Sequence, residues 1–418
     1  MNRIRKENIS ANQNLDENFF VVDEDRFNST YVSSLFLIKK NSKVSKEAFG
    51  VLSLLLSMAS LTNKNSKYTY SRDSKARENN VLFEFSEGYG QYFLSASISA
   101  PYKSRELFDT QGKLGKNLMR TIRSGWTKAP ADLNRVIEDI TYEYSLLDND
   151  PIFQMDHLIH LNYLRELQLG RYPYGDLDKI KELKFLDLDS ALKELIESPR
   201  MSAYVGDTNY RFVLSARKRL KPNSKIFPVT LKKEIVPRGT DLVVKNKKFK
   251  GEYVGFVFNL SKIHSEQTYV CNKILMELLF NKYYGLMLDV VSKERIEIVK
   301  TQLFPVGHCF IVYLHSDKKI SEDFIVEFEK KITNFYSKDL QEYAYMMKRY
   351  LIEKIMFGFD NPRDLVESKY LGRLGGLNIS SDVMITKLQN LNYKDFSSYL
   401  RKINFVGSMK IEGTSYEK

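Results

Sequence analysis

The chain has 418 residues, of which 43% are hydrophobic and 28% are charged, and its net charge is +12. These proportions are typical of a folded protein and exclude an intrinsically disordered one. No run reaches the ~18 to 20 apolar residues of a membrane helix, and residues 1–18 lack the apolar core of a secretory signal. We therefore expect a cytoplasmic protein with no membrane partner and, at ~150 residues per domain, with two or three domains.

In the first half, bulky residues alternate in short runs that predict strands, and apolar residues recur at helical spacing between them. The predicted strands are 31–38, 80–85, 91–100 and 201–205, and the predicted helices are 48–61, 107–122, a segment from 132, 152–169 and 186–196.

Most of the positive charge follows this half. Thirteen basic and two acidic residues lie between residues 211 and 250, a difference of +11. Three prolines in 217–238 favour a linker. We therefore predict an N-terminal half at 1–215, a basic linker at 216–245 and a C-terminal half at 246–418. The basic segment has little aromatic interleaving, which argues against a nucleic-acid partner and favours a solvated linker or a surface for an acidic partner.

The second half repeats the order of the first. It has predicted strands at 253–260, within 296–314 and at 406–411, and predicted helices at 268–280, 322–335, 340–357, 362–374 and 392–402. The repeated order indicates a duplication, and it predicts an α+β fold of two similar halves, each an antiparallel-rich sheet packed against helices.

Few residues are suited to bind metal. Cys271 and Cys309 have no further Cys or His at the spacing of a metal clamp, so we interpret them as buried thiols. His157 and His160 could meet on a helix, but the sequence fixes no third ligand for them.

Two segments carry a family resemblance that covers essentially the whole chain. Tyr172-Pro173-Tyr174-Gly175 precedes a predicted helix and a strand that ends in Gly206-Asp207, and Asp360-Asn361-Pro362-Arg363 opens a later helix. They are similar to the His-Pro-Tyr-Gly segment, the Gly-Asp strand end and the Ser-Pro-Arg helix start of the pitrilysin/insulinase-like zinc metallopeptidases. The chain most resembles the two-half bacterial type related to mitochondrial processing peptidase.

Active members of that family carry Gly-x-x-His-x-x-Glu-His-Met on their first long helix. Gly50 and Met58 match its ends, and Ser53, Leu56 and Ser57 stand at the His, Glu and His positions. Two imidazoles four residues apart can bind one zinc ion while the glutamate deprotonates its water. Serine hydroxyls are poor zinc ligands and leucine cannot act as a base. We therefore expect no catalytic residue, no metal and no cofactor in this chain.

The resemblance also implies two further sites. The third zinc ligand of the family would be Glu138 or Glu143, but one carboxylate cannot hold a catalytic zinc, and both are otherwise solvated helix positions. An Arg and a Tyr of the family hold the substrate backbone. In 289–298, Arg295 is shifted from the arginine position and Ile298 stands near that of the tyrosine, so Arg295 is either a substrate contact or a surface residue.

The resemblance implies an inactive subunit of a heterodimeric zinc metallopeptidase. A homologous partner would supply zinc, and this chain would complete a chamber for leader peptides such as bacteriocin or signalling-peptide precursors. The alternatives are a stand-alone peptide-binding, chaperone-like protein and, less favoured, a basic nucleic-acid-binding protein.

Overall fold

The computed structural model describes residues 18–23, 29–38, 42–62, 81–88, 91–101, 113–163, 172–206, 210–222, 242–260, 265–303, 309–334, 340–357, 361–377 and 380–414. The chain divides into two compact units, each of which takes segments from both halves of the sequence. Unit 1 consists of residues 1–143, 169–229 and 359–376, and unit 2 consists of residues 144–168, 230–358 and 377–418.

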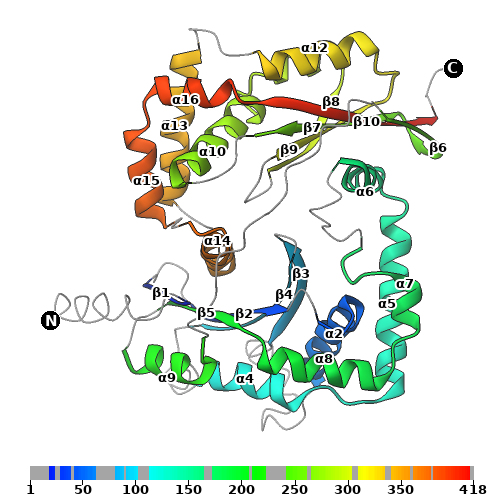
Figure 1. Ribbon diagram of the computed structural model, residues 1–418, viewed down its shortest axis with the longest axis vertical. Coiled ribbons are helices and arrows are strands. Elements are labelled where there is room, and N and C mark those ends of the chain that lie inside the picture. The colour runs from blue at the N-terminus through cyan, green and yellow to red at the C-terminus, as the bar shows by residue number, and fades with distance from the viewer. Residues whose placement is uncertain are drawn as a thin grey trace. The chain divides into compact units, whose positions relative to one another are not determined.

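Unit 1 is built on a five-stranded sheet with the order β1-β5-β2-β4-β3, in which only the β1 and β5 pair is parallel (Figure 1). Its strands are β1 (Phe19–Asp23), β2 (Ser29–Ile38), β3 (Leu82–Gly88), β4 (Gln91–Pro101) and β5 (Arg200–Gly206). Its helices are α2 (Lys46–Thr62), α4 (Leu114–Ser124), α5 (Pro130–Leu147, which runs on into unit 2), α7 (Leu177–Lys181), α8 (Phe185–Glu197), α9 (Tyr210–Leu220) and α14 (Pro362–Leu374).

The two faces of this sheet are covered by different helices. Successive side chains of a strand point to opposite faces. On one face Phe36 is buried beneath the guanidinium of Arg200, which also approaches Met119 of α4. On the other face the hydroxyl of Ser33 is hydrogen-bonded to that of Tyr370 of α14 at 2.7 Å. The sheet of unit 1 therefore lies between α14 on one face and α4 on the other.

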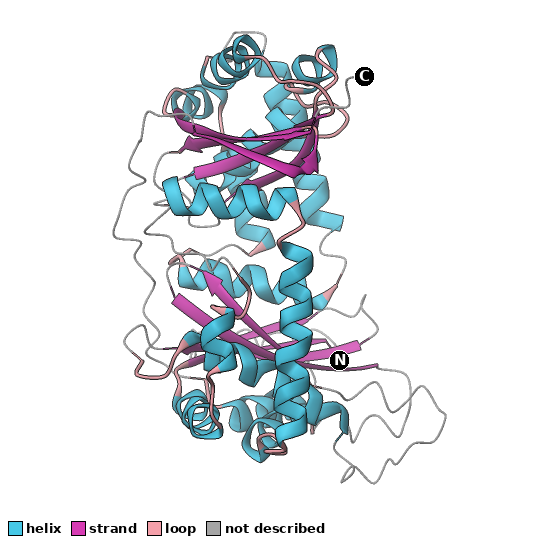
Figure 2. Cartoon of the chain, turned by 90° about the vertical axis from the view of Figure 1, so that its right-hand side faces the viewer, coloured by secondary structure: helices cyan, strands magenta, loops and turns pink. Residues whose placement is uncertain are grey.

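Unit 2 repeats this sheet with the order β6-β10-β7-β9-β8, in which only the β6 and β10 pair is parallel. Its strands are β6 (Leu242–Lys250), β7 (Glu252–Asn259), β8 (Glu297–Leu303), β9 (Cys309–Ser316) and β10 (Asn404–Thr414). Its helices are α6 (Pro151–Tyr163), α10 (Glu266–Phe280), α11 (Leu288–Lys293), α12 (Glu322–Thr333), α13 (Leu340–Phe357), α15 (Ser381–Asn390) and α16 (Tyr393–Leu400). Its core includes buried phenylalanines of β7, β9 and α12; the rings of Phe258 and Phe310 stack with centroids 4.9 Å apart. Figure 2 shows helices on both faces of each sheet.

Each unit contains one helix that comes from the other half of the sequence. α6 comes from the first half of the sequence but packs on β7 and β10 of unit 2, whereas α14 comes from the second half and packs on β2 and β5 of unit 1. Both helices begin with proline after a capping Asx residue: Asp150 accepts from the backbone N–H of Ile152, and Asn361 accepts from that of Asp364. Since β7 and β10 occupy the sheet positions of β2 and β5, the two helices are equivalent.

Two glycines let α6 lie close to its sheet. A Cβ atom added at Gly255 of β7 would overlap the Cδ1 atom of Ile159, and one added at Gly407 of β10 would lie 2.6 Å from the ring of Tyr163. The Tyr163 hydroxyl donates a hydrogen bond of 2.7 Å to the carbonyl oxygen of Ser408. The two glycines thus leave room on the sheet for the side chains of Ile159 and Tyr163.

The structure confirms the predicted α+β fold with two similar sheets, and most predicted elements within a few residues. Part of the predicted helix at 107–122 and most of the proposed linker at 216–245 lie outside the described residues. The described ends of that linker lie in α9 and the turn after it, and in β6. The elements missed by the sequence pattern are β1, β6, α7, α9, α11 and α15.

Candidate functional site

The two serines at the positions that the resemblance assigns to zinc ligands form hydrogen bonds within α2 itself. Ser53 is buried, and its hydroxyl donates a hydrogen bond of 2.7 Å to the carbonyl oxygen of Gly50. Ser57 is half-buried, and its hydroxyl donates to the carbonyl oxygen of Ser53 at 3.0 Å. Leu56 is fully buried in the core. At the three motif positions, the two polar side chains therefore serve the helix backbone and the apolar one serves packing.

The same side of α2 lies against the edge of β3 that faces away from β4. The backbone N–H of Phe83 donates to the hydroxyl of Ser57 at 3.3 Å. The hydroxyl of Ser60 donates to the carbonyl oxygen of Val81 at 2.8 Å. Residues of an antiparallel strand alternate in the direction of their backbone groups, so these groups are the ones that face away from β4. Two serine hydroxyls therefore occupy part of the edge to which a further strand would bind.

The two motif segments recognised in the sequence lie against each other. A Cβ atom added at Gly50 would lie 3.0 Å from the Cα and carbonyl oxygen of Tyr174, so only glycine permits this approach. Gly175 has a φ of 101°, and the backbone N–H of Asp176 donates to the buried carboxylate of Glu47 at 3.1 Å. The Tyr-Pro-Tyr-Gly turn is thereby fixed on the first two turns of α2.

A polar cluster follows from that turn. Burial raises the pKa of the Tyr174 hydroxyl, and the charges of Glu143 and Glu84 raise it further. Burial also raises the pKa of the half-buried Glu143 carboxyl. Glu84 forms an ion pair with Arg363 of α14 at 2.8 Å. The Tyr174 hydroxyl therefore stays protonated at neutral pH and can donate a hydrogen bond.

The structure separates the two candidate third ligands. Glu143 interacts electrostatically with Tyr174, which packs on α2, whereas Glu138 is exposed. No sequence pattern links Glu84 and Arg363, because 279 positions separate them in the chain. Within the described part of the chain, no group of three or more His, Cys, Asp or Glu side chains could hold a metal ion.

The histidine pair on α6 belongs to a buried network. Tyr313 of β9 donates to the carboxylate of Asp156, and His160 Nε2 lies 3.3 Å from the same carboxylate. Burial lowers the pKa of His160; Asp156 opposes this shift and Lys300 adds to it. His157 is buried as well. These contacts give His160 a role in the packing of α6 on its sheet.

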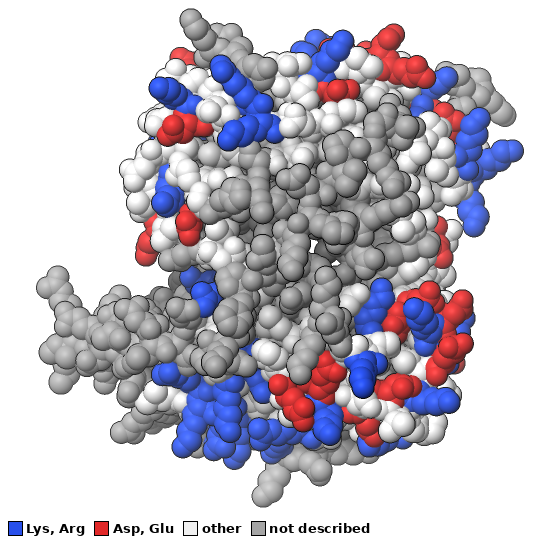
Figure 3. Space-filling model, viewed as in Figure 1, with Lys and Arg blue, Asp and Glu red and all other residues white. Residues whose placement is uncertain are grey.

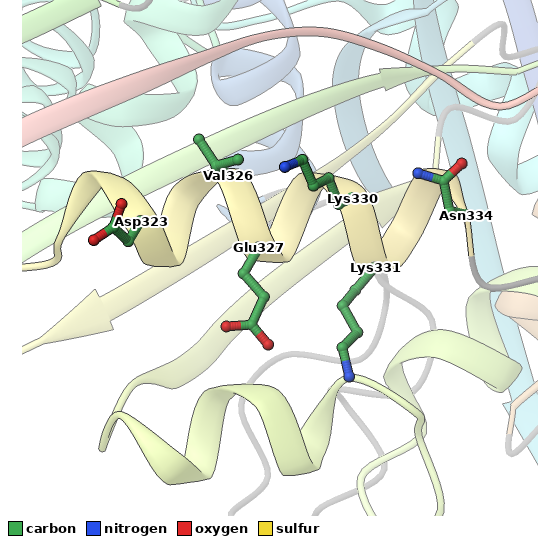
Figure 4. A pocket seen from close by; sticks show the side chains of 6 residues that line it. All are labelled: Asp323, Val326, Glu327, Lys330, Lys331 and Asn334. Atoms are coloured by element: carbon green, nitrogen blue, oxygen red, sulfur yellow. The ribbon is translucent and has the colours of Figure 1, made fainter.

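The remaining candidates lie in unit 2. Cys271 and Cys309 are free and buried, as predicted. Arg295 is exposed, has a φ of 54° and lies in the turn between α11 and β8, while Ile298 is half-buried on β8. A hollow along α12 is lined by side chains of both charges that point to different sides of one helix, which is typical of a solvated surface (Figure 4).

No protein-family model matches the chain, and no curated protein matches it. Solved structures do. A conserved protein from Enterococcus faecalis V583 superposes with a TM-score of 0.73 at 13% identity, over 96% of this chain and 97% of that one. The peptidase M16 inactive domain from Pseudomonas fluorescens gives 0.67 at 13% identity over 96% of each chain. A protease from Helicobacter pylori gives 0.66 at 12% identity over 95% and 98%.

The fold is that of M16-like peptidase domains. At these identities the likeness shows the fold alone, and it supports the family that the sequence resembles. The Pseudomonas fluorescens structure shows that the M16-like fold also occurs in a domain described as inactive.

Proposed function

We propose that this chain is a catalytically inactive subunit of a heterodimeric zinc metallopeptidase. The observation that carries the proposal is the bonding of the motif positions. The hydroxyls of Ser53 and Ser57 donate to carbonyl oxygens of their own helix, and Leu56 is fully buried. A catalytic zinc needs three protein ligands and a water, and its base must reach that water. Neither requirement is met by two bonded hydroxyls and an alkyl group.

The partner would be a homologous subunit with an intact His-x-x-Glu-His motif, which binds the zinc ion. The extended peptide would bind as an added strand on the partner's sheet, since backbone hydrogen bonds give affinity without selecting a sequence. The hydrogen bonds at β3 favour binding to the partner's sheet. Ser57 and Ser60 already pair with backbone groups of Phe83 and Val81 that an added strand would need. This chain would complete the chamber, and Arg295 remains a candidate contact with the peptide.

We propose leader-bearing peptides as substrates, such as precursors of bacteriocins or signalling peptides. The experiment uses this chain, a homologue from the same organism that carries His-x-x-Glu-His, and one such precursor peptide. We expect no cleavage by this chain alone, weak cleavage by the homologue alone and strong zinc-dependent cleavage by the mixture. A homologue whose motif glutamate is replaced by glutamine is the control, and it should abolish cleavage by the mixture.

Zinc-dependent hydrolysis by this chain alone would contradict the proposal. Failure of the two chains to associate in light scattering would also contradict it.

A further inference from the structure

Two basic stripes lie on α4 and α9 of unit 1. Lys113, Lys116, Arg120 and Arg123 follow three- and four-residue spacing, which places them on one face of α4 and its first flanking turn. All four are exposed. On and directly after α9, Arg217, Lys218, Arg219 and Lys221 are exposed or half-buried, and neither helix contains an acidic residue. Figure 3 shows Lys and Arg side chains gathered over α9 and α4 at the lower left. We call these eight residues the α4/α9 basic face.

The two stripes form one surface because the helices touch. A Cβ atom added at Gly115 of α4 would lie 3.1 Å from the Cα atom of Ala216 of α9, so the backbones approach closely. Leu118 and Leu220 are fully buried, which leaves the basic side chains to face outward. Burial lowers the pKa of nearby Arg200, and the charge of Arg123 lowers it further.

We propose that the α4/α9 basic face binds the surface of membranes that contain anionic phospholipids. Phosphate groups of a membrane attract basic side chains, and each one that lies near the membrane surface strengthens binding about fivefold. In the part of the chain described, Lys116, Arg120 and Lys218 have no carboxylate partner that would compete.

Leu214 favours a membrane over a nucleic acid. Its side chain is 40% exposed, and it precedes Lys218 by one helical turn, so it lies within the basic face. An apolar side chain between basic ones can enter the boundary between headgroups and acyl chains, but it gains nothing from a phosphate backbone. The described side chains of α4 and α9 include no exposed aromatic ring on which a base could stack.

This proposal is independent of the peptidase-like function, and it departs from the expectation of no membrane partner. That expectation came from hydropathy, which reports spanning segments; the helices described here indeed include none that could cross a membrane. Binding through surface charge is a separate property, and the two stripes lie about a hundred positions apart in the sequence.

The test is flotation of the purified full-length chain with vesicles of 30% phosphatidylglycerol and 70% phosphatidylcholine, and with vesicles of phosphatidylcholine alone. We expect binding to the first kind only, and a steep loss of binding as salt rises. The variant K116E/R120E/K218E/K221E should weaken binding at least ~100-fold, since four charges are reversed. The variant K293E/K318E/K319E/K402E makes the same change of net charge at exposed positions in unit 2 and should weaken it only a few-fold.

A second variant separates the membrane from other polyanions. Leu214→Asn removes the apolar contact without changing the charge, so it should weaken vesicle binding and leave retention on heparin unchanged. Three outcomes would overturn the proposal: no binding to the anionic vesicles, equal losses in the two quadruple variants, or tighter binding to a 20-base-pair DNA duplex than to the vesicles at the same salt concentration. Circular dichroism melts establish that each variant is folded.

Discussion

The hydroxyl of Ser57 donates a hydrogen bond to the carbonyl oxygen of Ser53, 3.0 Å away and one turn earlier on α2. Two positions that the family resemblance assigns to zinc-binding imidazoles are thus joined through the helix backbone. The site differs from an empty metal site in this respect, because its polar groups already have partners and its third position, Leu56, is part of the core.

Restoring the motif should cost stability. The variant S53H/L56E/S57H places a carboxylate where Leu56 is fully buried, and an uncompensated buried charge costs about 3–5 kcal/mol. We expect urea unfolding to show a loss of this size, and added zinc to recover part of it because zinc binds only the folded state. The control S53A/S57A should lose only about 1–3 kcal/mol in total. A triple variant as stable as the native chain without zinc would mean that these positions are not packed as described.

Gly50→Ala tests the contact between α2 and the Tyr172–Gly175 turn. In an exposed helix interior this change stabilises by about 1 kcal/mol. Here the added methyl group would meet the backbone of Tyr174 at 3.0 Å, and a backbone cannot rotate away. We expect a loss of about 1–3 kcal/mol in the free energy of unfolding. A gain in stability would show that the turn does not lie against the helix.

The close contact between Gly255 of β7 and Ile159 of α6 predicts an energetic coupling between these two residues. Gly255→Ala should destabilise unit 2, because the new methyl group overlaps the Cδ1 atom of Ile159. Ile159→Val removes that atom, so the double variant should be more stable than the sum of the single changes predicts, by about 0.5–3 kcal/mol. Additive losses in a double-mutant cycle would show that Ile159 does not lie against Gly255.

The sequence predicted the helices α6 and α14 but not the sheet on which each of them packs. The helix at 362–374 was predicted with its observed ends, because Asn361-Pro362 is a strong local start signal. That α6 and α14 pack on the sheet encoded by the other half could not be predicted, since the fitting of Ile159 to Gly255 depends on tertiary contacts. β6 was missed because most of its side chains are exposed and lack the alternation of a half-buried strand. At the site, the residue types led to the expectation of no zinc ligands, which stays a prediction, and the hydrogen bond from Ser60 to Val81 has no local signal in the sequence.

Stability should depend on His160 below neutral pH. Its pKa is lowered chiefly by burial, so the folded state binds fewer protons than the unfolded state once the pH falls below about 6.5. The contribution of His160 to the free energy of unfolding is fully present above that pH. It is lost as the pH falls towards the pKa that His160 has in the folded protein. His160→Gln should flatten this part of a plot of unfolding free energy against pH. Identical slopes for the two proteins would remove His160 from the explanation.

The two thiols should be unreactive in the folded protein. Burial raises the pKa of Cys271 to about 12 and raises that of Cys309 as well. Since the thiolate is the reactive form, a disulfide reagent at pH 8 should label neither in buffer and both in denaturant. Rapid labelling of the native chain would show that one of them is accessible.

Whether this chain is an inactive subunit is tested most directly by zinc content and peptide cleavage, measured for this chain alone, for a homologue with His-x-x-Glu-His and for their mixture. We expect zinc in the homologue only, no cleavage by this chain and a gain of cleavage on mixing. Bound zinc with zinc-dependent cleavage by this chain alone would contradict this expectation.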